Sequence, residues 1–182
     1  DLVNGLVSVS MPHPMRLRKS FTGDPEQRRL SKYAVGYQLP RRPEQLLVAD
    51  DAAEVGRILH RWSGGDWPDP LAETYFRRAF QFRATAHCAL EYHRWAVRSI
   101  PRPDGRRYLA RMVNDKVPRP VLQLHGTRDA SVLPRSVDGS EDFVTGPYRR
   151  VDLPESGHFP HEEDPAAFNG LLVDWLSGLH TS

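Results

Sequence analysis

The chain has 182 residues, of which 39% are hydrophobic and 26% are charged. These proportions are ordinary for a folded globular protein and exclude a disordered tail. The net charge is only +2, and acidic residues are interspersed among the arginines. The composition therefore indicates no basic surface for nucleic acid or for an anionic membrane, and a small uncharged molecule is the better expected partner.

The cysteine content and the hydropathy favour a cytoplasmic protein. Cys88 is the only cysteine, so an internal disulfide is excluded. No stretch approaches the apolar length of a membrane span, and the first residues lack the apolar run of a signal peptide. We expect no membrane partner.

The first predicted element is a strand within residues 2–11, which are nearly all apolar and are followed by Pro12. Such a run is typical of a strand in a parallel sheet with both faces covered. The sequence begins with Asp1 instead of Met, and a parallel strand needs neighbours. We therefore expect neighbouring strands upstream of residue 1 and interpret the chain as a fragment of a larger fold.

The middle of the chain is predicted to consist of helices and connections, without a convincing strand. A helix capped by Asp50 is expected to run to about Arg61, where residues 63–65 (Ser-Gly-Gly) end it. A second helix begins with Asp69-Pro70, an N-cap followed by a first-turn proline. A third covers about 84–97.

From about residue 117 the pattern changes to that of an α/β protein. Residues 120–126 form a short apolar run closed by glycine, and residues 149–154 form a weaker one, with a helix-sized gap between them. Asp164-Pro165 then begins a C-terminal helix with one apolar face. Strand, connection, strand and helix in this order predict a parallel sheet with right-handed crossovers.

Two polar side chains follow these two strands. Asp129 comes three residues after Gly126, and His158 lies in the loop after the next strand. Adjacent parallel strands lie about 4.8 Å apart, and their carboxyl ends share one edge of the sheet, so the carboxylate and the imidazole can meet. Asp129 would accept one ring N–H and leave the other nitrogen free as a base.

Each of these residues has a simpler interpretation. An aspartate in such a loop is usually a turn former or helix cap. The pair, in the order acid and then histidine, favours catalysis. The remaining histidines have no partners at ligand spacing, so we predict neither a metal nor a cofactor.

The same residues carry a resemblance to a known family. Residues 121–129, 156–165 and 168–176 resemble the last third of α/β-hydrolases. Within that superfamily, residues 37–44 and 89–94 resemble cap motifs of the epoxide hydrolase and haloalkane dehalogenase group. Residues 6–14 are similar to the strand that follows the family's nucleophile helix.

The resemblance implies a domain organisation and an activity. Residues 1–14 would be a core strand, 15–113 a helical cap, and 114–182 the C-terminal part of the core. The fold class would be α/β, the C-terminal half of an α/β-hydrolase parallel sheet with an inserted helical cap. The implied activity is hydrolysis of a small, largely apolar substrate, of epoxide or ester type, by a nucleophile-His-Asp triad.

The chain departs from the epoxide hydrolase pattern in its cap. Soluble epoxide hydrolases use two cap tyrosines as hydrogen-bond donors to the epoxide oxygen, and these positions correspond here to Gly36 and His93. Neighbouring phenols are available, and His93 is itself a proton donor. The candidate substrate-pocket residues are Tyr37, Tyr92, His93 and Phe159.

The nucleophile is missing from the sequence. Neither Gly-x-Ser-x-Gly nor Gly-x-Asp-x-Gly occurs in it, so the nucleophile, Asp or Ser, is expected upstream of residue 1 and activity is expected to require that half of the fold. Two alternatives stay open. The parent protein could be an esterase with a serine nucleophile, or the chain could be a non-catalytic remnant or binding module.

Overall fold

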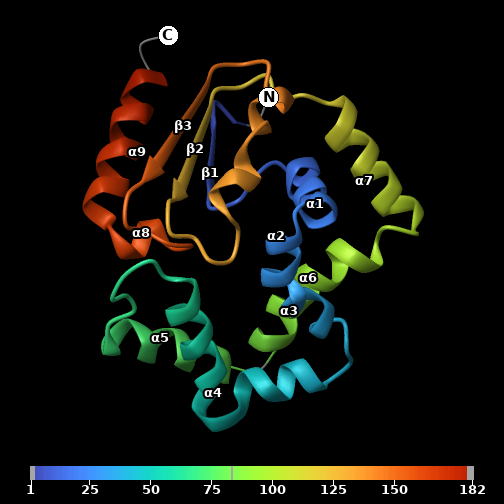
Figure 1. Cartoon of the computed structure of the whole chain (residues 1–182), viewed down its shortest axis with the longest axis vertical. Helices are drawn as coiled ribbons and strands as arrows, with labels where there is room; N and C mark the ends of the chain where they lie inside the picture. The colour runs from blue at the N-terminus through green and yellow to red at the C-terminus, as the bar shows by residue number, and fades with distance from the viewer. Residues whose placement is uncertain (1–2, 83, 180–182) are drawn as a thin grey trace.

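The computed structural model describes residues 3–82 and 84–179 and contains a parallel three-stranded sheet (Figure 1). The strands are β1 (Leu6–Val9), β2 (Val121–Gly126) and β3 (Tyr148–Leu153), in the spatial order β1-β2-β3. The α/β class and the three predicted strands are confirmed. Leu2, at the start of the first predicted strand, lies outside the described residues.

The central strand, β2, is buried along its whole length because it has a neighbour on each side. Leu6 of β1 pairs with Val121, and Gly126 pairs with Leu153 of β3. Among the described residues, β1 has no strand on its other side, and Leu6 is 46% exposed. The sheet thus has an open edge at β1.

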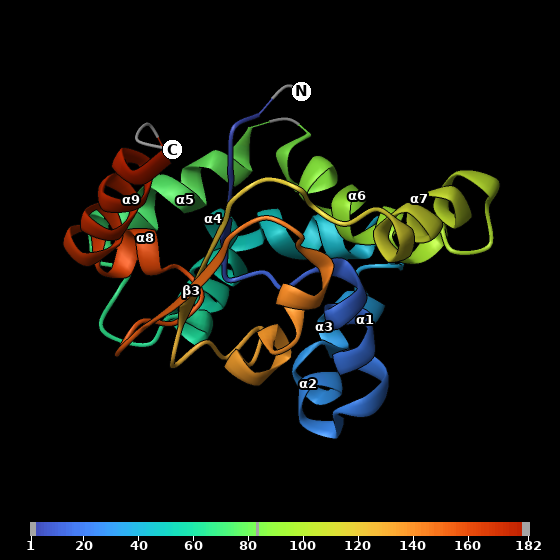
Figure 2. The same ribbon diagram turned by 90° about the horizontal axis from the view of Figure 1, so that it is seen from above.

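One face of the sheet is covered by α9 (Pro165–Leu179). Alternate residues of β2, Leu122 and Leu124, form a fully buried cluster with Leu153 and with Phe168 of this helix. Asp164 accepts a hydrogen bond from the amide of Ala167 at 3.0 Å, which confirms the predicted helix start. Viewed from above, α8 and α9 lie on one side of the strands and α1–α3 on the other (Figure 2).

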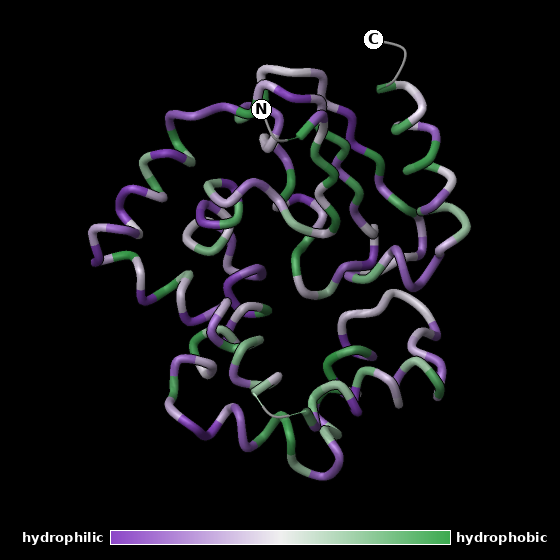
Figure 3. The backbone as a smooth tube through the Cα atoms, turned by 180° about the vertical axis from the view of Figure 1, so that it is seen from behind, coloured by the Kyte–Doolittle hydropathy of each residue, from purple (hydrophilic) through white to green (hydrophobic). Residues whose placement is uncertain are grey.

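Between β1 and β2 the chain forms a helical segment. Its helices are α1 (Pro14–Gly23), α2 (Pro25–Leu30), α3 (Lys32–Gly36), α4 (Arg42–Trp62), α5 (Pro70–Gln81), α6 (Thr85–Arg98) and α7 (Pro103–Asn114). As predicted, no strand occurs in the part of this segment that the structure describes. Hydrophilic and hydrophobic residues alternate along α7 in Figure 3, as expected for a helix with one apolar side.

The predicted start of α5 is confirmed, whereas that of α4 is wrong. The carboxylate of Asp69 accepts hydrogen bonds from the amides of Leu71 and Ala72 at 2.8 and 2.9 Å. Asp50 does not cap a helix, because α4 begins at Arg42 and kinks at residues 49–52, where Asp50 has a positive φ of 52°.

The kink in α4 is held from α5. The guanidinium of Arg77 donates to the carbonyl oxygens of Asp50 and Asp51 at 3.2 and 2.9 Å, and so satisfies carbonyls that the kink leaves without helical partners. The apolar side of α4 packs there in a buried cluster of Leu47, Ala52, Val55, Leu59, Ala86 and Leu90.

A buried arginine on α6 fixes the connection between α3 and α4. Arg94, 3% exposed, donates to the carbonyl oxygens of Tyr37 and Leu39, each at 2.8 Å, and to both carboxylate oxygens of Glu44. The Arg94 guanidinium lowers the pKa of Glu44 to about 2. These bonds hold Tyr37 at a constant position relative to α6.

The connection from β2 to β3 was expected to be helix-sized, and it contains two 3₁₀ turns instead, η1 (Pro134–Val137) and η2 (Ser140–Phe143). Gly139 between them has a φ of 83°, which stops a continuous helix. A one-turn helix, α8 (Pro160–Glu163), precedes α9 and was not predicted. Within residues 3–82 and 84–179, no helix has both the length and the apolar character needed to cross a bilayer.

The buried cluster between the sheet and α9 predicts which substitutions destabilise the fold. Leu124 is 0% exposed, so Leu124→Ala is expected to lower the free energy of unfolding by about 2–5 kcal/mol through lost burial and a cavity. Val173, 62% exposed on α9, provides the control: Val173→Ala should change the free energy of unfolding by less than about 0.5 kcal/mol. Urea denaturation of both variants measures this free energy, and equal losses of stability in the two would contradict the assignment of the core.

Candidate active site

The loop after β2, residues 127–133, which we call the acid loop, holds Asp129 in a fixed orientation. The side chain of Asp129 is fully buried, and its Oδ1 accepts hydrogen bonds from the amides of Ser131 and Val132, both at 2.8 Å. Burial of a carboxylate is costly unless its oxygens find donors, and these amides provide two of them. The second oxygen, Oδ2, remains for another donor.

That donor is His158, in the loop after β3, residues 154–159, which we call the histidine loop. The distance from His158 Nδ1 to Asp129 Oδ2 is 2.8 Å, so the hydrogen bond expected from the sequence is present. Because a carboxylate can only accept, Nδ1 carries the proton. Nε2 is then the ring nitrogen available as a base, on a side chain that is 17% exposed.

A second histidine contacts the same carboxylate from inside β2. His125 is fully buried, and its Nε2 lies 2.9 Å from the carbonyl oxygen of Val132 and 3.4 Å from Asp129 Oδ2. Burial lowers the pKa of His125. Its contacts with Val132 and Asp129 link β2 to the acid loop.

The turn after α4, residues 63–65, packs against the histidine loop at backbone distance, and that loop packs in the same way against the end of β2. A Cβ on Gly64 would lie 2.5 Å from the carbonyl oxygen of Glu155 and 2.6 Å from the nitrogen of Gly157. A Cβ on Gly157 would lie 2.3 Å from the nitrogen of Gly64, and one on Gly126 only 2.1 Å from the carbonyl oxygen of Gly157. Glycine at these three positions allows this approach.

Hydrogen bonds connect the same three segments. The amide of His158 donates to the carbonyl oxygen of Trp62 at 2.8 Å, and the guanidinium of Arg128 donates to that of Gly64 at 3.2 Å. Arg128 also forms an ion pair with Glu155. The helical segment thus contacts the backbone of His158 directly.

A row of aromatic side chains leads from His158 into the helical segment. The ring centroids of His158 and Trp62 are 5.3 Å apart, those of Trp62 and Tyr33 5.2 Å, and those of Tyr33 and Tyr37 5.3 Å. The ring of His93 lies 5.3 Å from that of Tyr37. Burial lowers the pKa of His93. Burial also raises the pKa of Tyr33, and the negative charge of Asp129 raises that pKa further by a smaller amount.

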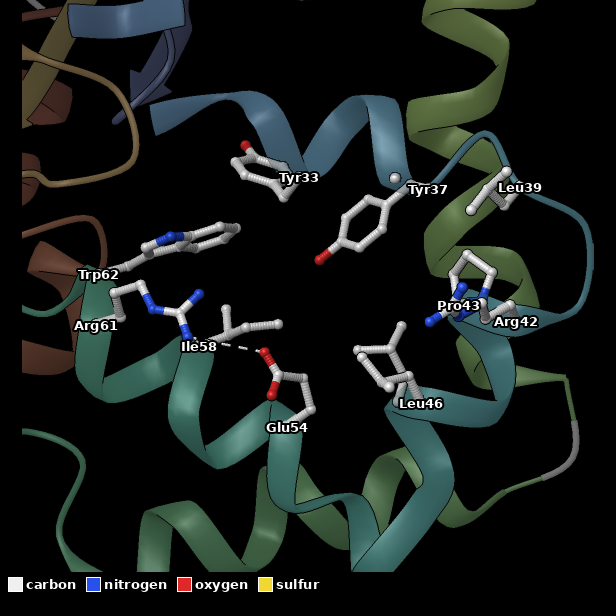
Figure 4. Close-up of a pocket in the computed structure, with 12 residues that line it drawn as sticks. Tyr33, Tyr37, Leu39, Arg42, Pro43, Leu46, Glu54, Ile58, Arg61 and Trp62 are labelled. Carbon is white, nitrogen blue, oxygen red and sulfur yellow. Dashed lines mark ion pairs between the residues drawn. The ribbon is translucent and has the colours of Figure 1, made fainter. Parts of the chain in front are cut away.

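Tyr33, Tyr37 and Trp62 line a cavity of about 300 Å³ between α3 and α4 (Figure 4). Figure 4 shows the Tyr37 hydroxyl pointing into it, toward Glu54, whose carboxylate pairs with Arg61 at 3.8 Å. Burial raises the pKa of Tyr37 to about 12. The phenol therefore stays a proton donor at neutral pH.

A larger cavity of about 780 Å³ lies against the sheet on the side away from α9. It is lined by residues of β1 and β2, including Leu6 and Gln123, and by residues of α6 and α7, including His93 and Tyr108. Tyr33 borders both cavities.

The four predicted pocket residues have different surroundings. Tyr37 and His93 belong to the aromatic row, and Phe159 packs between Trp62 and Trp67, with centroid distances of 6.4 and 5.1 Å. Tyr92 borders the larger cavity with His93, although its side chain is 77% exposed. The described residues contain no group of three or more metal-ligating side chains.

The sequence did not single out Trp62, the glycine contacts or Glu163. In the sequence Glu163 is only one residue of the segment 156–165, yet its carboxylate accepts hydrogen bonds from both the histidine loop and the turn at 63–65. The one local signal was the glycine pair at 64–65, which ends a helix but does not indicate what packs on it.

Comparison with solved structures confirms the fold as that of the α/β-hydrolases. An epoxide hydrolase from Bacillus megaterium, bound to its product (R)-3-[1]naphthyloxy-propane-1,2-diol, superposes with a TM-score of 0.77 and 19% identity, covering 96% of this chain and 61% of that one. Epoxide hydrolase A from Mycobacterium thermoresistibile gives a TM-score of 0.73 and 19% identity, covering 98% and 63%.

Sequence comparison confirms the resemblance to epoxide hydrolases. Epoxide hydrolase 3 of Xenopus tropicalis is 25% identical over 182 residues, which cover 97% of this chain and 47% of that protein. The chain thus spans about half the length of this relative. No family model matches the chain.

The close approach at residue 64 predicts contrasting effects for two neighbouring glycines. Gly64→Ala should push the turn away from the histidine loop and lower the free energy of unfolding by about 1–3 kcal/mol. A Cβ at Gly65 would meet nothing within 4 Å, so Gly65→Ala should be neutral or stabilise by up to about 1 kcal/mol. Thermal unfolding compares the two, and a neutral Gly64→Ala would refute the contact.

Proposed function

We propose that this chain supplies the acid and the base of a catalytic triad in an α/β-hydrolase that acts on a small, largely apolar epoxide or ester. The observation that carries this proposal is the 2.8 Å hydrogen bond from His158 Nδ1 to the buried Asp129. It holds the imidazole in the tautomer whose Nε2 can take a proton from water or from a nucleophile.

In this proposal the nucleophile lies upstream, on a strand that would pair with the open edge of β1. The unpaired edge supports it, as does the 61% coverage of the Bacillus megaterium structure. Residues 15–113 would then be the helical cap over the site, flanked by core residues 1–14 and 114–182.

The free, exposed Cys88 fits the predicted cytoplasmic location.

The chemistry depends on the nucleophile. An aspartate would attack the substrate to form an ester, and His158 Nε2 would then remove a proton from the water that hydrolyses this ester. A serine would first need His158 to take its hydroxyl proton. The resemblance to epoxide hydrolases favours aspartate, so the serine esterase is the second candidate.

Replacing His158 distinguishes these mechanisms in an enzyme that joins this chain to a nucleophile-bearing half. With an aspartate nucleophile, His158→Gln should still form the covalent ester with an epoxide and accumulate it, because only the water step needs the base. With a serine nucleophile, an activated ester should give little adduct. Intact-mass spectrometry measures both. No adduct and no turnover with either substrate class, in variant and parent, would favour a non-catalytic binding module.

Opening an epoxide also needs a proton donor for the developing alkoxide. We assign this role to the cap phenol Tyr37, with His93 beside it, because Gly36 lacks a side chain at the position of the family's first tyrosine. Tyr37 lies in the aromatic row and points into the cavity of Figure 4.

Removing this hydroxyl should affect epoxides selectively. Tyr37→Phe is expected to lower kcat for an epoxide by about 10²-fold or more, the usual cost of one lost oxyanion donor, with a smaller effect on an activated ester. Tyr75→Phe, at an exposed tyrosine that lines neither of these two cavities, is the control and should retain full activity. Steady-state kinetics on both substrates test this, and equal losses in Tyr37→Phe and Tyr75→Phe would contradict the assignment.

A further inference from the structure

The carboxylate of Glu163, at the end of α8, accepts hydrogen bonds from the nearby histidine loop and from the turn after α4, where Ser63 is 100 residues away in sequence. From the histidine loop, the amide of Gly157 donates to Oε2 at 2.8 Å and the amide of Phe159 donates to Oε1 at 2.9 Å. From the turn after α4, the amide of Gly64 and the hydroxyl of Ser63 donate to Oε2 at 2.7 and 3.1 Å.

These bonds leave the backbone around His158 with little freedom. The amide of His158 itself donates to the carbonyl oxygen of Trp62, so the three consecutive amides of residues 157–159 all have acceptors. Two of the three acceptors are oxygens of Glu163. The third is the carbonyl oxygen of Trp62, which directly precedes the turn that Glu163 also holds.

A carboxylate suits this position because it only accepts hydrogen bonds. Its two oxygens receive four donors, three of them backbone amides, and charged acceptors form stronger bonds than neutral ones. A glutamine would present an NH₂ group to at least one amide donor. The glycine contacts at 64 and 157 leave too little space between the two backbones for them to adjust.

We propose that Glu163 is a positioning residue for His158: it clamps the histidine loop to the turn at residues 63–65, so that Nδ1 meets Asp129. This inference rests on the proposed function for its catalytic meaning. Among the described residues, no hydrogen bond joins Glu163 to the imidazole or to Asp129, so in this proposal it acts through the backbone. A shift of about 1 Å in a catalytic group can cost about 10²-fold in rate.

The test compares Glu163→Gln with Glu162→Gln in the 182-residue chain. Glu162 is an exposed neighbour of Glu163 on the same helix, and Glu162→Gln removes the same charge as Glu163→Gln. The readout is the nuclear magnetic resonance of the His158 ring: the Nδ1 proton bonded to Asp129, and the ring ¹⁵N shifts that report its tautomer.

Glu163→Gln should weaken or abolish the Nδ1 proton signal of His158 and mix the two tautomers of its ring. The amides of Gly157 and Phe159 should exchange with solvent faster by about tenfold or more. A tenfold change corresponds to a loss of roughly 1.4 kcal/mol of protection. Glu162→Gln should leave all three unchanged. A normal His158 ring in Glu163→Gln would overturn the proposal, even if stability fell.

Gly64→Ala provides a second route that retains the carboxylate. It should disturb the His158 Nδ1 proton in the same direction, whereas Gly65→Ala should not. If Glu163→Gln does not fold and Gly64→Ala leaves the imidazole unchanged, Glu163 is a stabilising residue only, and the proposal fails.

The ring readout does not require turnover, so it separates the two proposals. A disturbed imidazole in an inactive protein would support positioning while the proposed function failed. In an active full-length enzyme, Glu163→Gln should lower kcat by about 10²-fold with KM nearly unchanged, since the change misplaces a base and not the substrate.

Discussion

The hydrogen bond between Asp129 and His158 is the interaction on which the site depends, and it requires a parallel sheet. Asp129 and His158 follow adjacent strands, β2 and β3, whose carboxyl ends lie at the same edge. An antiparallel arrangement would place the two loops at opposite ends of the sheet. Burial of Asp129 then strengthens the bond, since the local dielectric is low and its other oxygen is held by two amides.

The second constraint is the close packing of backbones around the histidine loop. Gly64, Gly126 and Gly157 remove the side chains that would keep the three segments apart, and Glu163 satisfies the amides that come together there. Motions of α4 relative to the sheet would therefore move His158. Since α4 also lines the cavity of Figure 4, the same helix contacts the histidine loop and borders the cavity.

The fold leaves the chemistry open, because one fold supports many reactions. The proposed substrate class rests on the aromatic row from Trp62 to His93 and on the phenol of Tyr37. In that proposal the substrate is apolar and gains negative charge on oxygen during the reaction.

Local signals in the sequence were sufficient for the strands, for α5 and α9, and for the pair Asp129 and His158. Strand hydrophobicity, an aspartate before a first-turn proline, and the order of acid and histidine all act over a few residues. The kink in α4 and the contacts of Glu163 could not be predicted in this way, since their partners are remote in sequence. Arg77 holds the kink from another helix. Only the tertiary structure brings Gly64 against Gly157, because close packing depends on which backbones meet in space.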